Sequence, residues 1–165
     1  MEANVTLTVT GLTGNFGIEK RMESAQRIAP GRFRMQGKLE VAHEVLKGRT
    51  VLLIEDSWLI AQGYKSMLEL SGMEVIGPAA NVADAEELLL SHVPELALVD
   101  INLQGSDSYE LIAALVERNI PVVIISGNEV SPEVAASVDC VLTKPIGGAT
   151  LMSTLRRVAA ARDFK

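Results

Sequence analysis

Residues 96–102 read LALVDIN, an apolar run that ends in Asp100 and reaches a second polar side chain at Asn102. The run lacks polar alternation, which predicts a strand buried on both faces. Three other segments repeat the design of an apolar run followed at once by a charged or polar residue. They are VLLIEDS at 51–57, VVIISGN at 122–128 and VLTKPI at 141–146. A further short strand is predicted at 74–76, closed by Gly77 and Pro78.

Helical periodicity fills the intervals between these strands. Helices are predicted at 57–70, 81–93, 109–118 and 150–161, while 128–138 is weakly helical at most. The first of these helices is expected to turn one apolar face inward, made of Leu59, Ile60, Gly63, Met67 and Leu70. Buried strands alternating with amphipathic helices predict an α/β fold, a doubly wound five-stranded parallel sheet of the flavodoxin-like type. Its ligand site should lie outside the carboxyl ends of the strands.

The first 48 residues do not continue this alternation. We expect residues 1–48 to form an irregular N-terminal extension, flexible or loosely packed, and residues 49–165 to form the α/β domain. Within the extension, residues 5–10 alternate Val or Leu with Thr, as a half-exposed strand would. Residues 19–28 and 39–46 are candidate short helices. Glycines at 11, 14 and 17 are spaced evenly, but a phosphate-binding loop would also need a strand, a helix and an acid in register.

Composition and charge exclude several classes of protein. The formal net charge of −6 divides into +3 over residues 1–50 and −9 over residues 51–165, which argues against nucleic-acid binding by the α/β domain. No apolar stretch approaches the length of a membrane span, and no secretory signal is visible. The lone Cys140 excludes an internal disulfide and a cysteine-rich zinc site, which fits the reducing cytoplasm.

Acidic residues gather where the predicted strands end. Glu55 and Asp56 follow the strand at 51–54, and Asp100 lies at the end of the strand predicted at 96–101. Carboxylates brought into one cleft repel one another, and a divalent cation relieves that repulsion. Oxygen ligands with an incomplete protein shell suit Mg²⁺.

The other strand ends supply the groups that phosphoryl transfer needs. Asp100 is placed to act as a nucleophile toward a phosphoryl donor. Lys144 supplies a fixed ammonium, Ser126 a hydroxyl and the region of Gly127 backbone N–H groups for the negative charge of the transferring group. Each residue alone has an ordinary structural explanation, such as a charge at a helix start or a turn residue. Their conjunction, in this order and each at a strand end, favours a site. Trp58, beside the acid pair, is predicted to pack in the core or at its rim.

The four strand segments quoted above resemble the four sequence blocks of response-regulator receiver domains, and the resemblance spans nearly all of the chain after residue 47. It implies the flavodoxin-like receiver fold of five βα units. It also implies that Asp56 and Asp100 hold Mg²⁺, helped by the backbone carbonyl of Asn102, while Glu55 acts largely through water. Asp100 would then be the phosphoacceptor.

By the same resemblance, Ser126 is the switch hydroxyl and Lys144 the partner of the phosphoryl group. Two features depart from the usual receiver pattern. Val141 occupies the position that usually carries an aromatic switch residue, and the interval between Ser126 and Lys144 leaves room only for a shortened fourth helix. With the phrases EVIGPAANVADA and RNIPVVIISG, these departures resemble alphaproteobacterial receivers that partner HWE-type histidine kinases.

The resemblance implies a cytoplasmic two-component response regulator that accepts a phosphoryl group on Asp100 from a histidine kinase or a histidine phosphotransfer protein. Because the last predicted helix uses the C-terminus, we expect a stand-alone receiver. It would signal by binding a downstream protein or serve as a phosphate sink, with a homodimer possible. Its only reactions would be weak self-phosphotransfer and autodephosphorylation. The tail of a hybrid kinase is an alternative.

Two other classes of function are considered. A Mg²⁺-dependent phosphatase with an aspartyl nucleophile, similar to haloacid-dehalogenase enzymes, would need a second aspartate two residues after the nucleophile, where this chain has Asn102. A scaffold that is never phosphorylated would not need the acid pair, Asp100 and Lys144 together.

Overall fold

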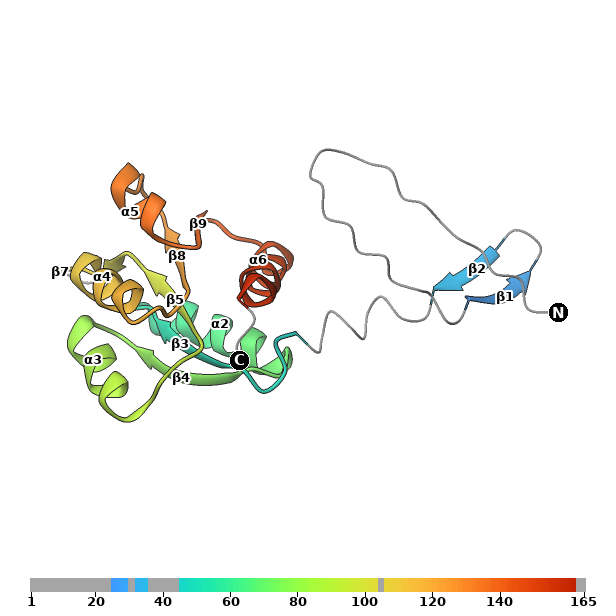
Figure 1. Ribbon diagram of the computed structural model, residues 1–165, viewed down its shortest axis with the longest axis horizontal. Helices are drawn as coiled ribbons and strands as arrows, with labels where there is room; N and C mark the ends of the chain where they lie inside the picture. The colour runs from blue at the N-terminus through green and yellow to red at the C-terminus, as the bar shows by residue number, and fades with distance from the viewer. Residues whose placement is uncertain (1–24, 30–31, 36–44, 104–105, 163–165) are drawn as a thin grey trace. The chain divides into compact units, whose positions relative to one another are not determined.

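A computed structural model of the chain (Figure 1) describes residues 25–29, 32–35, 45–103 and 106–162, with backbone alone for 25–29, 32–35 and 106–107. The chain divides into two compact units, Met1–Gly37 and Lys38–Lys165. In the first unit, β1 (Ala25–Ala29) pairs antiparallel with β2 (Arg32–Met35).

The hairpin corrects part of the expectation for the extension. The helix predicted at 19–28 is wrong over residues 25–28, which pair as a strand. The Pro-Gly pair at 30–31 is a turn signal that favours a hairpin over a continuous helix. The predicted strand at 5–10 lies outside the described residues, as does most of the candidate helix at 39–46, where the described residues 45 and 46 form a turn.

The second unit is built on a five-stranded parallel sheet, as predicted. Its strands are β3 (Thr50–Ile54), β4 (Glu74–Ala79), β5 (Leu96–Asp100), β8 (Val122–Ser126) and β9 (Cys140–Thr143), in the order β4-β3-β5-β8-β9. All four neighbouring pairs are parallel. The connections run one way from β3 to β4 and the other way from β5 onward. The switch point therefore lies between β3 and β5, where such folds form a ligand crevice.

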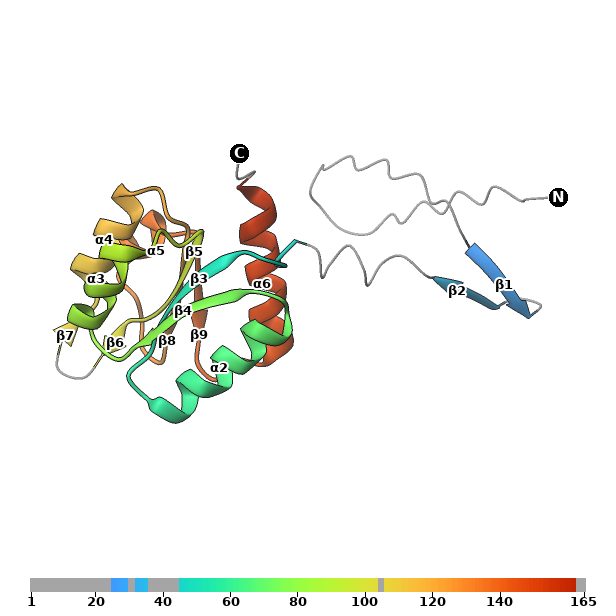
Figure 2. The same cartoon turned by 90° about the horizontal axis from the view of Figure 1, so that it is seen from below.

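Helices cover both faces of the sheet. They are α2 (Trp58–Leu70), α3 (Val82–Ser91), α4 (Tyr109–Glu117), α5 (Pro132–Ser137) and α6 (Gly148–Ala161). Figure 2 shows α2 and α6 on one side of the sheet and α3, α4 and α5 on the other. Successive strand residues point to opposite faces, so Val51 and Leu53 join the core under α2 and α6, and Leu52 and Ile54 join the core on the other side. No helix among the described residues is long and apolar enough to cross a membrane.

Two segments depart from the regular alternation of strands and helices. The segment before β9 forms only the six-residue helix α5, which confirms the expected short fourth helical segment. Directly after β5, a small antiparallel pair forms between β6 (Asn102–Leu103) and β7 (Ser106–Asp107).

Leu46 is completely buried in the core beneath α2 and α6, so the packed core includes a residue before 49.

Strand β4 continues past the point where it was predicted to stop. Gly77 and Pro78 lie inside the strand, and pairing resumes between Ala79 and Ile54 after an irregularity. Gly77 has a φ of 100°, and a Cβ there would lie 2.9 Å from the carbonyl oxygen of Leu53, so only glycine fits. The added end of β4 matters for the site because the carbonyl of Ala79 accepts the backbone N–H of Glu55 at 3.0 Å.

The predicted inward face of α2 is wrong for most of its members. Leu59 and Leu70 are 74% and 83% exposed, Ile60 and Gly63 are also exposed, and Met67 alone packs partly against the core. The buried residues are instead Ala61 and Leu68. Apolar side chains cover a wide arc of this helix, from Leu59 through Ile60 to Leu68, so the sequence did not single out which part of that arc is buried. Trp58 is 73% exposed, which also overturns its predicted packing.

Candidate functional site

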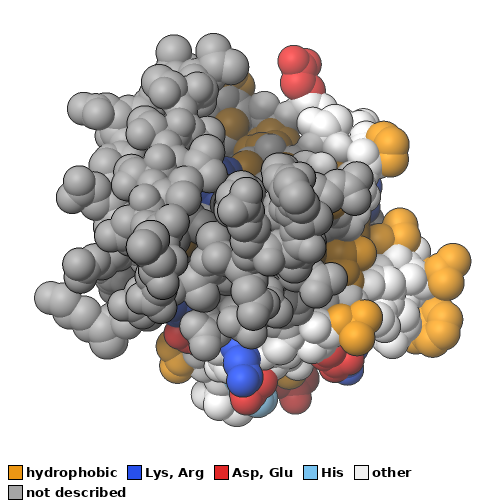
Figure 3. Space-filling model, turned by 90° about the vertical axis from the view of Figure 1, so that its right-hand side faces the viewer, with side chains coloured by type: hydrophobic (Ala, Val, Ile, Leu, Met, Phe, Trp, Pro, Cys, Tyr) orange, Lys and Arg blue, Asp and Glu red, His pale blue; other side chains and the backbone are white. Residues whose placement is uncertain are grey.

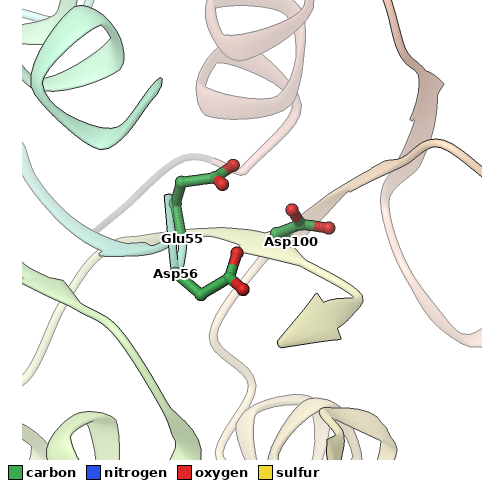
Figure 4. Close-up of side chains that lie close together, drawn as sticks. All are labelled: Glu55, Asp56 and Asp100. Atoms are coloured by element: carbon green, nitrogen blue, oxygen red, sulfur yellow. The ribbon is translucent and has the colours of Figure 1, made fainter. Parts of the chain in front are cut away.

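Three carboxylates meet at the switch point of the sheet. Glu55 and Asp56 directly follow β3, and Asp100 is the last residue of the neighbouring β5. Figure 4 shows the three side chains gathered around one space, and one carboxylate oxygen from each lies within 4.8 Å of the other two. Glu55 and Asp100 are only 3% and 4% exposed, while Asp56 is half-buried. The predicted convergence of these acids is therefore present.

Lys144, which follows β9, binds two of the three carboxylates. Its Nζ lies 2.5 Å from Asp100 Oδ2 and 3.1 Å from Glu55 Oε2. Because the side chain of Lys144 is only 25% exposed, these charge-assisted bonds are partly shielded from water. Among the described residues one ammonium faces three carboxylates, which leaves the cleft with an excess of negative charge.

Burial and neighbouring charges shift the protonation of this cluster. Burial raises the pKa of Glu55, and the charge of Asp100 raises it further, against the lowering effect of Lys144 and of the Ser57 N–H. Burial lowers the pKa of Lys144, but its hydrogen bonds to Asp100 and Glu55, and their charges, outweigh burial and leave that pKa raised. Lys144 therefore stays protonated, and Glu55 is a weaker acid than an exposed glutamate.

Backbone N–H groups bind the other carboxylate oxygen of Asp100 and of Glu55. Asp100 Oδ1 accepts the N–H of Asn102 at 3.1 Å, and Glu55 Oε1 accepts the N–H of Ser57 at 3.2 Å. The side chain of Asn102 is exposed, so its contact with the site in this structure is made by its main chain. These bonds orient the two buried carboxylates before any ligand arrives.

Ser126 ends β8 at the same edge and is almost completely buried. Its hydroxyl donates to the carbonyl of Asn128 at 2.8 Å and accepts the N–H of the same residue at 3.1 Å. The hydroxyl is thus engaged with its own loop and not with a carboxylate. The backbone N–H of Lys144 donates to the carbonyl of Ser126 at 2.7 Å, so the two residues are tied to each other.

Two residues near the site were not singled out from the sequence as functional. Ser108 is fully buried, and its hydroxyl lies 3.2 Å from the carbonyl oxygen of Asp100. Tyr64 on α2 is half-buried; burial raises its pKa, Lys144 lowers it, and Glu55 and Asp100 raise it. A serine just before a helix reads as an ordinary N-cap, and a tyrosine in a helix reads as packing, so neither pattern was distinctive.

The arrangement fits a hard divalent cation and a phosphoryl group. Carboxylate oxygens this close together suit Mg²⁺, which keeps several waters and shares phosphate oxygens with its protein ligands. Asp100 offers a buried oxygen nucleophile, and Lys144 offers a fixed positive charge beside it. Both lie at the carboxyl edge of the sheet, where a ligand can reach them.

Comparison with known proteins agrees with this chemistry. The model of the response regulator receiver domain matches residues 51–156. Similar curated proteins include the transcriptional regulatory protein PdtaR of Mycobacterium tuberculosis, 30% identical over 79 residues, which are 47% of this chain and 38% of that protein. The nitrate/nitrite response regulator protein NarL of Escherichia coli is 28% identical over 118 residues, 67% of this chain and 55% of its own. The chain thus spans only part of the length of these relatives.

Solved structures show the same fold at lower identity. The PhyR response regulator receiver domain of Erythrobacter litoralis aligns with a TM-score of 0.61 and 24% identity, covering 72% of this chain and 95% of that chain. A CheY-like receiver domain from Methylobacillus flagellatus aligns with the same TM-score and identity, covering 68% of this chain and 99% of that one.

Proposed function

This chain belongs to the response regulator receiver family, and from that premise we propose that it accepts a phosphoryl group on Asp100 from a histidine kinase or a histidine phosphotransfer protein. The observation that carries the proposal is the contact of Lys144 with Asp100 inside a cluster of three carboxylates. A buried aspartate so close to an ammonium and two further acids has the nucleophile and the charge partner that phosphoryl transfer requires.

In this proposal the acid cluster binds Mg²⁺. Asp56 and Asp100 would hold the ion directly, with the backbone carbonyl of Asn102 and with Glu55 acting through water. When bound, the ion neutralises the excess carboxylate charge and the charge of the incoming phosphoryl group. The close approach of the three carboxylates supports this assignment.

The phosphoryl step follows from the positions of Asp100 and Lys144. A carboxylate oxygen of Asp100 attacks the phosphorus of a phosphohistidine, the P–N bond breaks, and an acyl phosphate forms on Asp100 as the imidazole leaves. No general base is needed, because a carboxylate has no proton that must be removed before it attacks. Lys144, now beside Asp100 Oδ2, would pair with a phosphoryl oxygen of the product.

Ser126 would report the new phosphoryl group. To donate to a phosphoryl oxygen, its hydroxyl must first leave the carbonyl of Asn128. Phosphorylation would therefore disturb the loop that begins at Gly127. Because Val141 stands in the usual aromatic position, we expect the change to be read from this loop and α5, without rotation of an aromatic ring.

A direct test is phosphotransfer profiling. Purified histidine kinases and histidine phosphotransfer proteins, each already phosphorylated, are mixed with the chain, and transfer of label is followed over time. One donor should transfer much faster than the others. Failure of every donor, together with failure of small-molecule phosphodonors, would overturn the proposal.

The raised pKa of Glu55 predicts an unusual pH dependence of stability. Below the ordinary value of 4.5, Glu55 is protonated in both the folded and unfolded chain. Above it the unfolded chain loses the proton first, so this contribution to the free energy of unfolding is lost as the pH rises through the raised pKa. Other carboxylates add their own slopes, so the quantity to measure is the difference between the wild type and Glu55→Gln.

Urea unfolding from pH 4.5 to neutrality should show that difference falling with pH when divalent metal is absent. Added Mg²⁺ should reverse the trend, because the ion favours the ionised form of the cluster. A difference that stays flat in both conditions would show that Glu55 titrates normally.

The exposed start of α2 is the surface we propose for docking of the phosphodonor. Trp58 and Leu59 are 73% and 74% exposed and follow directly on the acid pair. Figure 3 shows hydrophobic side chains projecting at the right-hand margin of the described surface. Large apolar side chains left in water beside a reactive group are typical of protein contacts.

Trp58→Ala with Leu59→Ala should therefore slow transfer from a protein donor by about tenfold, the effect of losing roughly 1.4 kcal/mol of binding. Labelling by a small-molecule phosphodonor should not change. Leu70→Ala is the matched control, because Leu70 is 83% exposed at the opposite end of the same helix. Equal slowing with the small-molecule donor would show that the two substitutions act on the phosphoacceptor site and not on docking of the protein donor.

Several finer assignments belong to the same proposal. The chain would act as a stand-alone cytoplasmic receiver or as the receiver part of a hybrid kinase. Its output would be binding of a downstream protein, dimerisation or drainage of phosphate, with only weak autodephosphorylation of its own. A dedicated phosphatase is less favoured because Asn102 cannot act as the general acid that such an enzyme requires.

A further inference from the structure

Ser108 occupies the N-cap of α4 but does not act as one. Its side chain makes no hydrogen bond to the first turn of the helix. The N-caps of two other helices behave as expected: Asn81 accepts the N–H of Asp84, and Ser131 accepts the N–H of Val134. The hydroxyl of Ser108 therefore makes its hydrogen bonds outside the first turn of α4.

That hydroxyl points back to the end of β5. It lies 3.2 Å from the carbonyl oxygen of Asp100 and 3.2 Å from that of Ile101, and Ser108 is completely buried. A hydroxyl has one proton to donate, so the two carbonyls share it. The backbone N–H of Ser108 also approaches the carbonyl of Ile101, at 3.5 Å.

The contact joins the two ends of a small loop that leaves from the phosphoacceptor. The β6–β7 pair runs between Ile101 and Ser108. Its first residue, Asn102, donates its N–H to Asp100 Oδ1. Ser108 thus fixes the main chain on one side of Asp100, while Asn102 fixes the carboxylate from the same loop.

We propose that Ser108 is a positioning residue for phosphoryl acceptance, which holds the main chain of Asp100 and Asn102 so that the Asp100 carboxylate keeps its reactive orientation. The inference rests on the proposed function of Asp100. Without the hydroxyl, the far end of the loop carrying Asn102 keeps only its main-chain contacts, so the nucleophile and the Asn102 carbonyl proposed to face the metal are held less firmly.

A purely structural role for a buried serine is the competing explanation, and Ser71 provides the matched control. Ser71 is also buried, and its hydroxyl donates to the carbonyl of Leu68 at 2.6 Å, at the end of α2. Ser71→Ala and Ser108→Ala each remove one buried hydroxyl bound to a main-chain carbonyl. They should lower the melting temperature to a similar extent.

The variants should separate in function. In the full chain, Ser108→Ala should weaken Mg²⁺ binding, measured by calorimetry, and slow labelling by a small-molecule acyl phosphate, each by about tenfold, as loss of an outer-shell partner does. Ser71→Ala should match the wild type in both. Ser108→Thr keeps the hydroxyl and should recover most of the rate.

Wild-type values of both quantities in Ser108→Ala would overturn the inference. So would a Ser108→Thr protein that is folded yet as slow as Ser108→Ala, since packing would then be responsible. If the wild type itself takes no phosphoryl group, the proposed function fails, and Mg²⁺ affinity alone still decides the role of Ser108.

Discussion

Asp100→Asn is expected to abolish phosphorylation of the chain. An amide has almost the shape of the carboxylate, so the buried site is kept, but its oxygen is neutral and a poor nucleophile. The variant also loses the charge that Lys144 contacts. Intact-mass analysis after incubation with a small-molecule phosphodonor and Mg²⁺ should show one added phosphoryl group in the wild type and none in the variant.

Asp84→Asn is the control for this experiment. Asp84 is an exposed aspartate in the first turn of α3 and is not a member of the acid cluster. It should be labelled as the wild type is. Labelling of Asp100→Asn at the wild-type level would show that Asp100 is not the phosphoacceptor. Peptide mapping would then identify the labelled side chain.

Lys144→Ala is expected to have the second large effect, on stability and on the response to phosphate. In the metal-free protein the change leaves Glu55 and Asp100 buried without their cation. Removing one partner of a buried ionic cluster costs about 3 kcal/mol, at the lower end of the usual range because Lys144 is partly exposed. Mg²⁺ should still bind and restore much of that loss, because it supplies positive charge to the same carboxylates.

Urea unfolding with and without Mg²⁺ measures this compensation. Lys65→Ala is the comparison, because Lys65 and Glu69 form a largely solvent-accessible pair on α2 at 3.9 Å that should contribute little. The phosphorylated Lys144→Ala protein should also fail to reach the conformation that binds a downstream partner. Normal partner affinity in that protein would show that another group senses the phosphoryl oxygens.

Much of the fold could be predicted because its strands carry a strong pattern. Unbroken apolar runs such as that ending at Asp100 permit few environments other than a doubly covered sheet. The convergence of Glu55, Asp56, Asp100 and Lys144 followed from a geometric rule, that parallel strands end at one edge. Neither prediction required knowledge of side-chain contacts.

The errors have physical causes of a different kind. The buried face of α2 depends on the rotation of the helix about its axis, and an apolar arc wider than the buried face does not specify that rotation. The continuation of β4 depends on the left-handed backbone of Gly77, which looks in sequence like a turn. Ser108 was not singled out from the sequence at all, because whether a serine before a helix caps its first turn or bonds a carbonyl of another segment is decided by tertiary structure.

The main-chain bond from Lys144 to Ser126 has a consequence for how a phosphoryl group is sensed. Because β8 and β9 are hydrogen-bonded to each other at this point, the side chains of Ser126 and Lys144, which we propose sense the group, start from neighbouring main-chain positions with a fixed spacing. Neither can approach the phosphoryl group by moving its strand alone. A bound group should therefore have to reach Lys144 and Ser126 at the same time. A mimic that is smaller or less charged than a phosphoryl group would contact only one of them and would leave the loop after Ser126 unchanged.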